Sequence, residues 1–280
     1  METGVWTTAE IVVGLSLSAL YVFTPRALLH VQGASPPSDG AHYHVIRTLV
    51  CVWLSSNFKL LLLKKRRDCA ARSAQATSKL IAFLAILLNA FHGNCMSKLY
   101  GDKLPLVDIA SCLFFILSSL SHVSFTKTTA AAVVELNRLL TDPQSLTLHI
   151  DFLATCVFGL LWLACPDWLL GFQTDEPEDD AFHLHLIRAF GAMMIGDGFV
   201  ALAAQNLKTK QDEPPIFAGR VLGTTVLFLL MIYTLTTTST WRGIHVWFGL
   251  VGAGVWTGNS VQGYLELKKR AGIWDVTKSK

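Results

Sequence analysis

The residue of this chain with the clearest potential for chemistry is Asp197, a carboxylate flanked by Gly196 and Gly198 within a long apolar stretch. An ionisable side chain inside a membrane-spanning helix costs at least about 2.5 kcal/mol on insertion scales, so it normally faces a polar partner or a water-filled cavity. One interpretation places Asp197 on a pathway for an ion or a proton. The alternative is a closely packed helix with one satisfied carboxyl group, for which Asn259 and Gln262 are the expected partners.

A second small polar triplet lies at the corresponding depth of the first half of the chain. Its members stand 141 positions before Gly196, Asp197 and Gly198, and they are Ser55, Ser56 and Asn57. Both triplets lie past the middle of an otherwise apolar segment. Ser56 and Asn57 are therefore pathway candidates together with Asp197.

An H-x-H-x-x-R pattern occurs twice and supplies imidazole and guanidinium groups: His42, His44 and Arg47 in the first copy, and His183, His185 and Arg188 in the second. Residues two apart point to nearly opposite sides of a helix, so the two histidines of one copy make a poor metal site. Residues three apart share a face, which favours Arg47 beside His44, and the matching pair in the second copy, as a site for an anionic headgroup or substrate. The alternative is structural: Asp39 and Asp180 cap the helices, and the histidines and arginines lie in the headgroup layer.

These repeated residues belong to a longer internal duplication with a constant offset of 141 positions. Twelve identities connect positions 25–61 with positions 166–202 without a gap. A period of this length is too long for a solenoid repeat and indicates two fused copies of one module. Pro25 and Pro166 are one such pair, and each is expected to kink or end its helix, because proline removes a backbone donor. Glu10 and Asp151 are an acidic pair, which we interpret as charges that cap helix N-termini.

The composition is typical of an integral membrane protein. Hydrophobic residues make up 52% of the chain, charged residues make up 15%, and the mean hydropathy is +0.45. A helix that crosses the hydrocarbon layer needs about 20 mostly apolar residues. The sequence contains eight such segments: 8–30, 42–63, 78–97, 104–124, 147–171, 184–207, 216–238 and 243–265. The fourth and the eighth are the weakest, because they contain Asp108 and a Gly-rich stretch. The predicted fold class is an all-α integral membrane protein, with eight transmembrane helices in two tandem, same-orientation four-helix modules.

Basic residues determine the predicted orientation. Lys and Arg residues follow the second, fourth, sixth and eighth segments, whereas the loop at 174–180 is acidic. Basic short loops remain cytoplasmic, so both termini are predicted to be cytoplasmic and the two modules are related by an axis along the membrane normal. The predicted domains are a first module at 1–125, a cytoplasmic linker at 126–146, a second module at 147–267 and a basic cytoplasmic tail at 268–280. The linker is either a short amphipathic helix on the membrane surface or an extension of the fourth span.

No catalytic constellation, cofactor motif or metal-ligand spacing stands out, and the six cysteines fall mostly within the spans. We therefore predict a non-enzymatic multi-pass membrane protein, a scaffold or assembly protein, that needs no metal or cofactor. The expected partners are the lipid bilayer and anionic headgroups at the cytoplasmic basic loops, and no nucleic acid. Two alternatives stay open: a transporter or channel for a small solute or protons with its site between the modules, and a membrane enzyme that acts on lipid or in redox chemistry.

Overall fold

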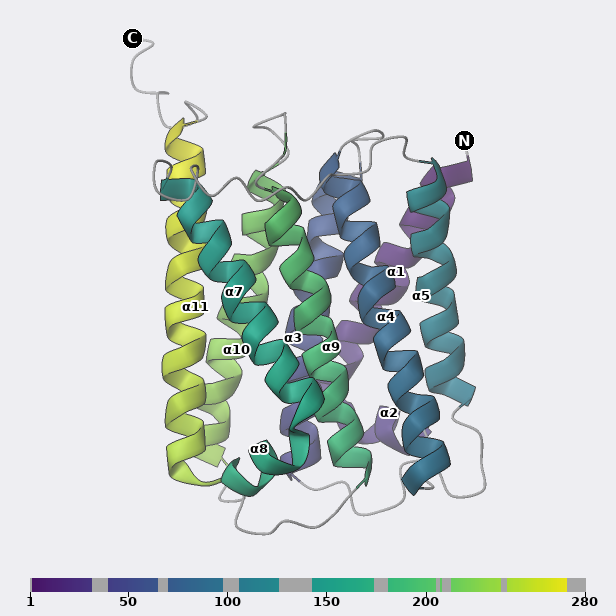
Figure 1. The fold of residues 1–280 in the computed structure, drawn as a ribbon, viewed down its shortest axis with the longest axis vertical. Coiled ribbons are helices and arrows are strands. Elements are labelled where there is room, and N and C mark those ends of the chain that lie inside the picture. The colour runs from purple at the N-terminus through teal and green to yellow at the C-terminus, as the bar shows by residue number, and fades with distance from the viewer. Residues whose placement is uncertain are drawn as a thin grey trace.

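The computed structural model describes residues 2–31, 40–64, 70–97, 106–125, 143–173, 181–204, 207, 213–237 and 241–270. These residues form ten helices and no strand (Figure 1). The first half contains α1 (Glu2–Phe23), α2 (Pro25–Val31), α3 (Gly40–Leu63), α4 (Ala70–Ser97) and α5 (Leu106–Phe125). The second half contains α7 (Pro143–Ala164), α8 (Pro166–Gln173), α9 (Ala181–Ala204), α10 (Pro214–Thr237) and α11 (Gly243–Arg270). The described part of the chain is therefore all-helical.

Six segments of these helices are long and apolar enough to cross a membrane: Val5–Phe23, His42–Leu63, Ala70–Gly93, Leu146–Ala164, Phe182–Ala204 and Pro214–Thr237. α5 provides a shorter apolar segment, Asp108–His122, and α11 is not among the six. These two helices correspond to the two segments that the sequence marks as weakest. The long helices run side by side, and α2 and α8 lie at the same end of the bundle (Figure 1).

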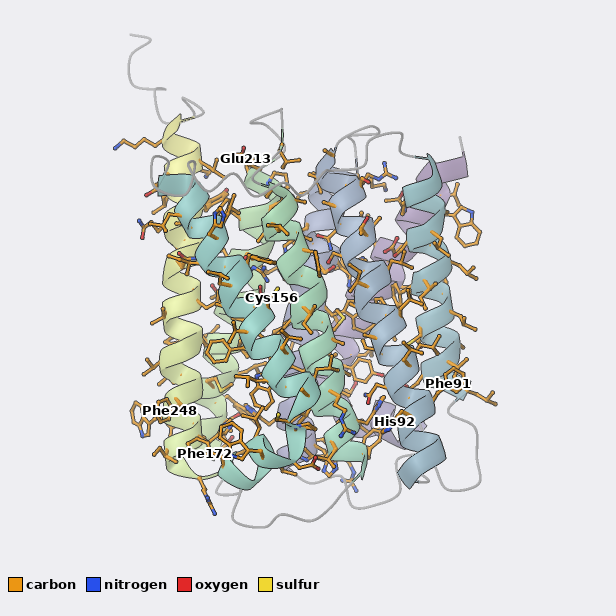
Figure 2. All side chains as sticks on the ribbon, in the orientation of Figure 1. Phe91, His92, Cys156, Phe172, Glu213 and Phe248 are labelled. Carbon is orange, nitrogen blue, oxygen red and sulfur yellow. The ribbon has the colours of Figure 1, made fainter. Side chains whose placement is uncertain are left out.

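Apolar side chains cover the outside of the bundle, and several charged side chains are buried inside it. Phe91 and Phe248 project outward (Figure 2) and are 45% and 64% exposed. In contrast, Lys59, Lys79 and Glu10 are among the largest fully buried side chains. A large exposed apolar surface is unfavourable in water but not in hydrocarbon, so this distribution indicates a membrane protein.

The centre of the bundle is formed by α3 and α9, which pack against each other. α4 lies along α9 and α10 lies along α3, so the third long helix of each half packs extensively against the other half. Glycines permit this close contact. A Cβ atom on Gly223 would lie 2.7 Å from the Cys51 carbonyl oxygen, and one on Gly196 would lie 2.7 Å from the Ser78 carbonyl oxygen. Helices of both halves therefore share one interior.

Two prolines mark the places where a long helix is followed by a short one. α1 and α2 are separated at Thr24, and α7 and α8 are separated at Cys165. Pro25 and Pro166 are the first residues of the two short helices, and both are buried. Proline is favoured at the first position of a helix, because the missing N–H has no intrahelical acceptor there. α8 accordingly turns away from the direction of α7 (Figure 1).

Some predictions made from the sequence fall outside the described residues. They are the capping roles of Asp39 and Asp180, the linker up to residue 142, the acidic loop at 174–180 and the tail beyond Arg270.

Candidate functional site

Asp197 of α9 lies in a buried network of ion pairs that joins five helices. Its Oδ1 atom accepts a hydrogen bond from Lys59 Nζ of α3 at 2.5 Å, and its Oδ2 atom accepts one from Arg220 Nη1 of α10. Arg220 also donates from Nε and Nη2 to Asp151 Oδ2 of α7, at 3.0 and 2.6 Å. Trp256 Nε1 of α11 donates to the other oxygen of Asp151 at 2.6 Å. We call the two cations and two carboxylates, Lys59, Asp197, Arg220 and Asp151, the central charge network.

The prediction that Asn259 and Gln262 are the partners of Asp197 is wrong. Asn259 donates to the Thr147 carbonyl oxygen at 3.2 Å, and Gln262 donates to Glu266 at 3.2 Å instead. The side chain of Asp197 is only 2% exposed. In such a low-dielectric place a carboxylate needs both a counter-charge and hydrogen bonds. Cations on other helices supply both, whereas neutral amides supply hydrogen bonds but no charge. Both carboxylate oxygens of Asp197 are therefore held by cations.

A second network with the same plan lies in the first half. Lys79 Nζ of α4 donates to Glu10 Oε1 of α1 and to Asn57 Oδ1 of α3, both at 2.8 Å. Ser118 Oγ of α5 donates to the other oxygen of Glu10 at 2.6 Å. Glu10 and Asp151 each lie about two turns inside their helices. The interpretation that they cap helix N-termini is therefore wrong, and each is the anion of a buried ion pair.

The two networks are related by the 141-residue offset of the sequence. Three pairs of residues stand 141 positions apart: Glu10 and Asp151, Lys79 and Arg220, and Phe115 and Trp256. In both networks the cation lies near an aromatic ring, with Lys79 Nζ 6.0 Å from the Phe115 centroid and Arg220 Cζ 5.2 Å from the Trp256 centroid. Such a contact contributes about 0.5–2 kcal/mol. Each half thus contains one acid, one base and one aromatic ring in the same relation.

The other pathway candidates of α3 are buried beside these networks. Ser56 Oγ accepts a hydrogen bond from Gln75 Nε2 of α4 at 2.6 Å. Asn57 accepts the bond from Lys79 and donates from Nδ2 to the Trp53 carbonyl oxygen at 3.0 Å. Ser56 and Asn57 therefore belong to the same polar layer as Lys59, which is on the same helix.

The H-x-H-x-x-R residues lie at the other end of α3 and α9 from the charge networks. The His42 and His183 rings contact each other, with centroids 4.9 Å apart. His44 Nδ1 is 2.7 Å from Thr234 Oγ1 of α10, and the His44 ring is 5.0 Å from that of Trp241. All four rings are buried. In the described residues no group of His, Cys, Asp and Glu has an arrangement that could hold a metal ion.

The remaining residues of the two motifs have separate surroundings. His185 Nδ1 is 2.8 Å from Asn89 Nδ2 of α4, so His185 faces a different helix from His44. Arg47 Nε donates to the Val22 carbonyl oxygen at 3.0 Å. Arg188 is half-buried on α9. The motif therefore contributes mainly to helix contacts at this end, and His44 alone of these residues lines the cavity described next.

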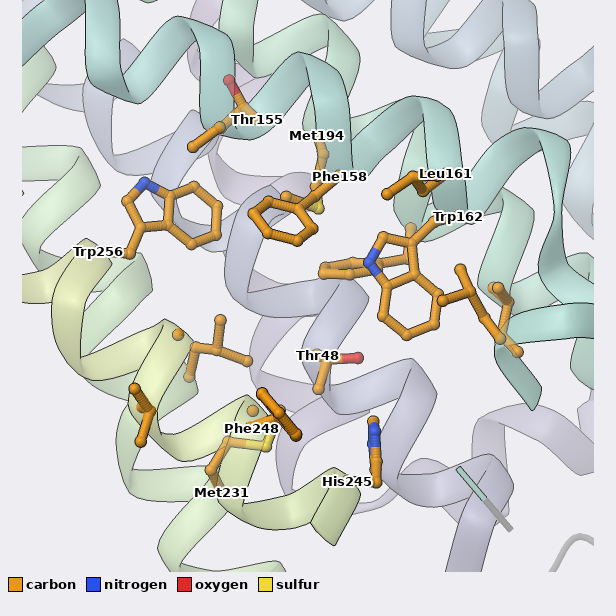
Figure 3. Close-up of a pocket in the computed structure, with 18 of the residues that line it drawn as sticks. Thr48, Thr155, Phe158, Leu161, Trp162, Met194, Met231, His245, Phe248 and Trp256 are labelled. Carbon is orange, nitrogen blue, oxygen red and sulfur yellow. The ribbon is translucent and has the colours of Figure 1, made fainter. Parts of the chain in front are cut away.

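A cavity of about 650 Å³ lies between the helices of the second half, α7, α8, α9, α10 and α11, and α3 of the first half (Figure 3). We call it the second-half cavity. Its walls are mostly apolar and aromatic, and they include Phe158, Trp162, Met194, Phe248 and Trp256 (Figure 3). Pockets of about 300–1,000 Å³ with such walls are typical sites for small molecules.

The second-half cavity has two polar ends and an apolar mouth. Asp151 and Asn259 contribute to one end, and His44, Trp241 and His245 contribute to the other. Lining residues from α7 and α11 are strongly exposed: Phe158 is 55%, Phe248 is 64% and Val255 is 68% exposed. The cavity therefore opens sideways between α7 and α11, toward the surface that faces lipid in a membrane.

A family model described as a domain of unknown function, DUF8292, matches residues 8–265. The chain belongs to the DUF8292 family. The matched range includes both charge networks and every lining residue of the second-half cavity, so these features lie within the DUF8292 domain. No curated protein and no solved structure matches the chain.

The two halves of this DUF8292 domain differ where the cavity lies. In the first half Trp53, Phe83 and Phe115 pack ring against ring, with centroids 4.6–6.1 Å apart. The residues 141 positions later are Met194, Thr224 and Trp256, and of these Met194 and Trp256 line the cavity. Two large rings of the first half are thus replaced by smaller side chains in the second.

Three important cations of the DUF8292 domain were missed by reasoning from the sequence: Lys59, Lys79 and Arg220. All three lie inside predicted spans, where a charge is as costly as at Asp197. Lys79 and Arg220 also stand 141 positions apart. A search for charged residues that recur at this offset would have found Lys79 and Arg220, but not Lys59, whose counterpart is Val200.

Proposed function

We propose that the protein is a non-enzymatic, multi-pass membrane protein that binds a lipophilic ligand in the second-half cavity. The observation that carries this proposal is the cavity itself: about 650 Å³, lined by aromatic and aliphatic side chains and open between α7 and α11. In the first half the corresponding place is filled by the packed rings of Trp53, Phe83 and Phe115. The module is therefore stable without a cavity, which further supports a binding role for the second-half cavity.

We further propose that residues 1–125 and 147–267 are two same-orientation copies of a four-helix module, related by a rotation about the membrane normal. The linker at 126–146 and the tail at 268–280 complete this organisation. The order of long and short helices is the same in both halves, which supports eight spans. α11 has 28 residues, which corresponds to a length of about 42 Å and is sufficient to cross the hydrocarbon layer.

The central charge network favours a structural role for Asp197 over proton transport. A pathway carboxylate needs access to water, whereas both oxygens of Asp197 are hydrogen-bonded to Lys59 and Arg220 and the side chain is 2% exposed. Lys59 belongs to the first half and Asp197 to the second. The ion pair therefore adds a polar link between the two halves.

The proposed orientation has both termini in the cytoplasm, with anionic lipid headgroups near the basic loops. A cysteine introduced at Asp179 is then expected to react with a membrane-impermeant maleimide in intact cells, whereas Lys65→Cys reacts only after permeabilisation. The measurement is gel-based detection of the labelled protein in a background without other reactive cysteines. The reverse pattern of labelling would contradict the orientation.

Filling the cavity should weaken ligand binding. Gly252 lines the cavity, and a Cβ atom there would meet no heavy atom within 4 Å. Gly252→Phe would therefore place a ring in the cavity without a backbone clash. We expect photolabelling of the cavity walls by a diazirine derivative of n-hexadecane, in lipid nanodiscs and mapped by peptide mass spectrometry, to fall about tenfold.

Gly258→Phe is the matched control, because Gly258 also lies on α11 in open space but outside the cavity lining. This variant should be labelled like the unmodified protein. If hexadecane labels both variants equally, the cavity does not bind lipophiles. A scaffold or assembly role would then be the better proposal.

A further inference from the structure

The end of the second-half cavity at His44 contains a buried hydrogen-bond donor that has no partner among the described residues. Trp241 lines the cavity and is 5% exposed, and its Nε1 atom has no hydrogen-bond partner within the described part of the chain. An unsatisfied buried donor costs about 1–3 kcal/mol, so a ligand group in the cavity that accepts a hydrogen bond from this donor would be stabilised. The indole is therefore a candidate contact for a polar group of the ligand.

Two imidazoles lie beside this indole. The ring centroids of His44 and His245 are 5.0 and 4.9 Å from that of Trp241, and both histidines line the cavity. The ring of His245 lies at the edge of the cavity near Thr48 (Figure 3). A neutral imidazole has one donor and one acceptor nitrogen, whereas an indole only donates. Together they match a ligand group that both accepts and donates a hydrogen bond.

The charges of the lining exclude an anionic ligand. Among the described residues that line the cavity none is Lys or Arg, whereas Asp151 is present. A buried carboxylate or phosphate would lack a counter-charge here, and its desolvation would be strongly unfavourable. Fatty acids and phospholipid headgroups are therefore poor ligands, and a neutral polar group is favoured.

At the other end of the cavity the polar side chains are already engaged, and Asn259 donates to the Thr147 carbonyl oxygen. The Asp151 carboxylate there already accepts hydrogen bonds from Arg220 on one oxygen and from Trp256 on the other. The ligand's polar group therefore belongs at Trp241. His44 lies in the first turns of α3 and His245 in the first turn of α11, close to the end of the bundle. An amphiphile bound in this direction would keep its polar group near the membrane surface, as it does in a bilayer.

We infer that the second-half cavity binds a neutral lipophilic alcohol whose hydroxyl group lies between Trp241 Nε1 and the imidazoles of His44 and His245. This inference rests on the function proposed above. The hydroxyl accepts from the indole and donates to an imidazole. The apolar body lies along the aromatic walls. Sterols and long-chain primary alcohols share this chemistry.

The inference is tested by competition against the diazirine derivative of n-hexadecane, with the full-length protein in nanodiscs. The competitors are cholesterol and its deoxy analogue cholest-5-ene, and hexadecanol and unlabelled hexadecane. We expect at least one of the two alcohols to compete about tenfold better than its hydrocarbon counterpart, as one satisfied hydrogen bond predicts. A preference for cholesterol would identify a rigid sterol-like ligand, and a preference for hexadecanol a flexible one.

Trp241→Phe removes the donor but keeps an aromatic ring, so it should abolish the preference for the alcohol while hexadecane still labels the cavity. Trp53→Phe is the control, because Trp53 Nε1 is also buried without a partner in the described residues but lies outside the cavity lining. His245→Leu provides a second test should Trp241→Phe not fold. Equal competition by alcohols and hydrocarbons, with cavity labelling intact, would overturn this inference and leave the proposed function standing. Absence of cavity labelling would overturn both.

Discussion

Arg220→Met is expected to lower the free energy of unfolding by about 3–5 kcal/mol, because it removes the shared cation of two buried carboxylates. Arg220 donates to both Asp151 and Asp197, and its side chain is 5% exposed. Without it, the partners that remain among the described residues are Trp256 for the Asp151 carboxylate and Lys59 for the Asp197 carboxylate. Unfolding by a denaturing detergent, followed by tryptophan fluorescence in mixed micelles, measures the change.

Two further variants make this prediction specific to the bridging geometry. Arg220→Lys should lose less stability than Arg220→Met, because an ammonium group keeps the positive charge. It should still lose some stability, because an ammonium group lacks the planar fork that reaches two carboxylates. Arg26→Met removes an exposed arginine of α2 and should change stability by no more than about 0.5 kcal/mol. An Arg220→Met protein as stable as the Arg26→Met protein would contradict the central charge network.

The long apolar segments made the helical membrane fold predictable from the sequence. The polar ends of the helices were not predictable in this way. The third predicted span begins at residue 78, whereas α4 begins at Ala70. Arg72 and Gln75 lie in the missing turns, and both are buried. Their polarity ends the hydropathy signal although their side chains face inward. Hydropathy measures composition, and it cannot distinguish a buried polar residue from one in water.

The depth of Asp197 was readable from the sequence, but its partners were not. Lys59 lies 138 positions away and Arg220 lies 23 positions away on another helix, so no local spacing connects them. Their meeting depends on α10 packing along α3 and on α3 packing along α9, which is a tertiary feature. The second-half cavity was out of reach for the same reason, because a cavity is a deficit of side-chain volume among six helices.

The contact between Lys59 and Asp197 offers the sharpest test of how the two halves are held together. Asp197→Leu strands the Lys59 ammonium, which is 0% exposed, and should cost about 3–5 kcal/mol. Lys59→Met strands the carboxylate only partly, because Arg220 still donates to it, and should cost less. The double variant Lys59→Met/Asp197→Leu removes one charge of each sign and leaves the pair of Arg220 and Asp151 intact. It should therefore be more stable than Asp197→Leu alone.

The same detergent titration of all four proteins gives the coupling energy of the pair, which we expect to be about 2–3 kcal/mol. Combining Asp197→Leu with Lys269→Met, at an exposed position near the end of α11, should instead be additive within about 0.5 kcal/mol. A similarly small coupling for Lys59 and Asp197 would mean that the ion pair does not stabilise the fold. A large coupling would mean that protonation of Asp197 weakens one of the contacts between the halves and destabilises the fold. Proton transport through this residue would then be opposed by that loss of stability, so vesicles that contain the unmodified protein should carry no Asp197-dependent proton flux.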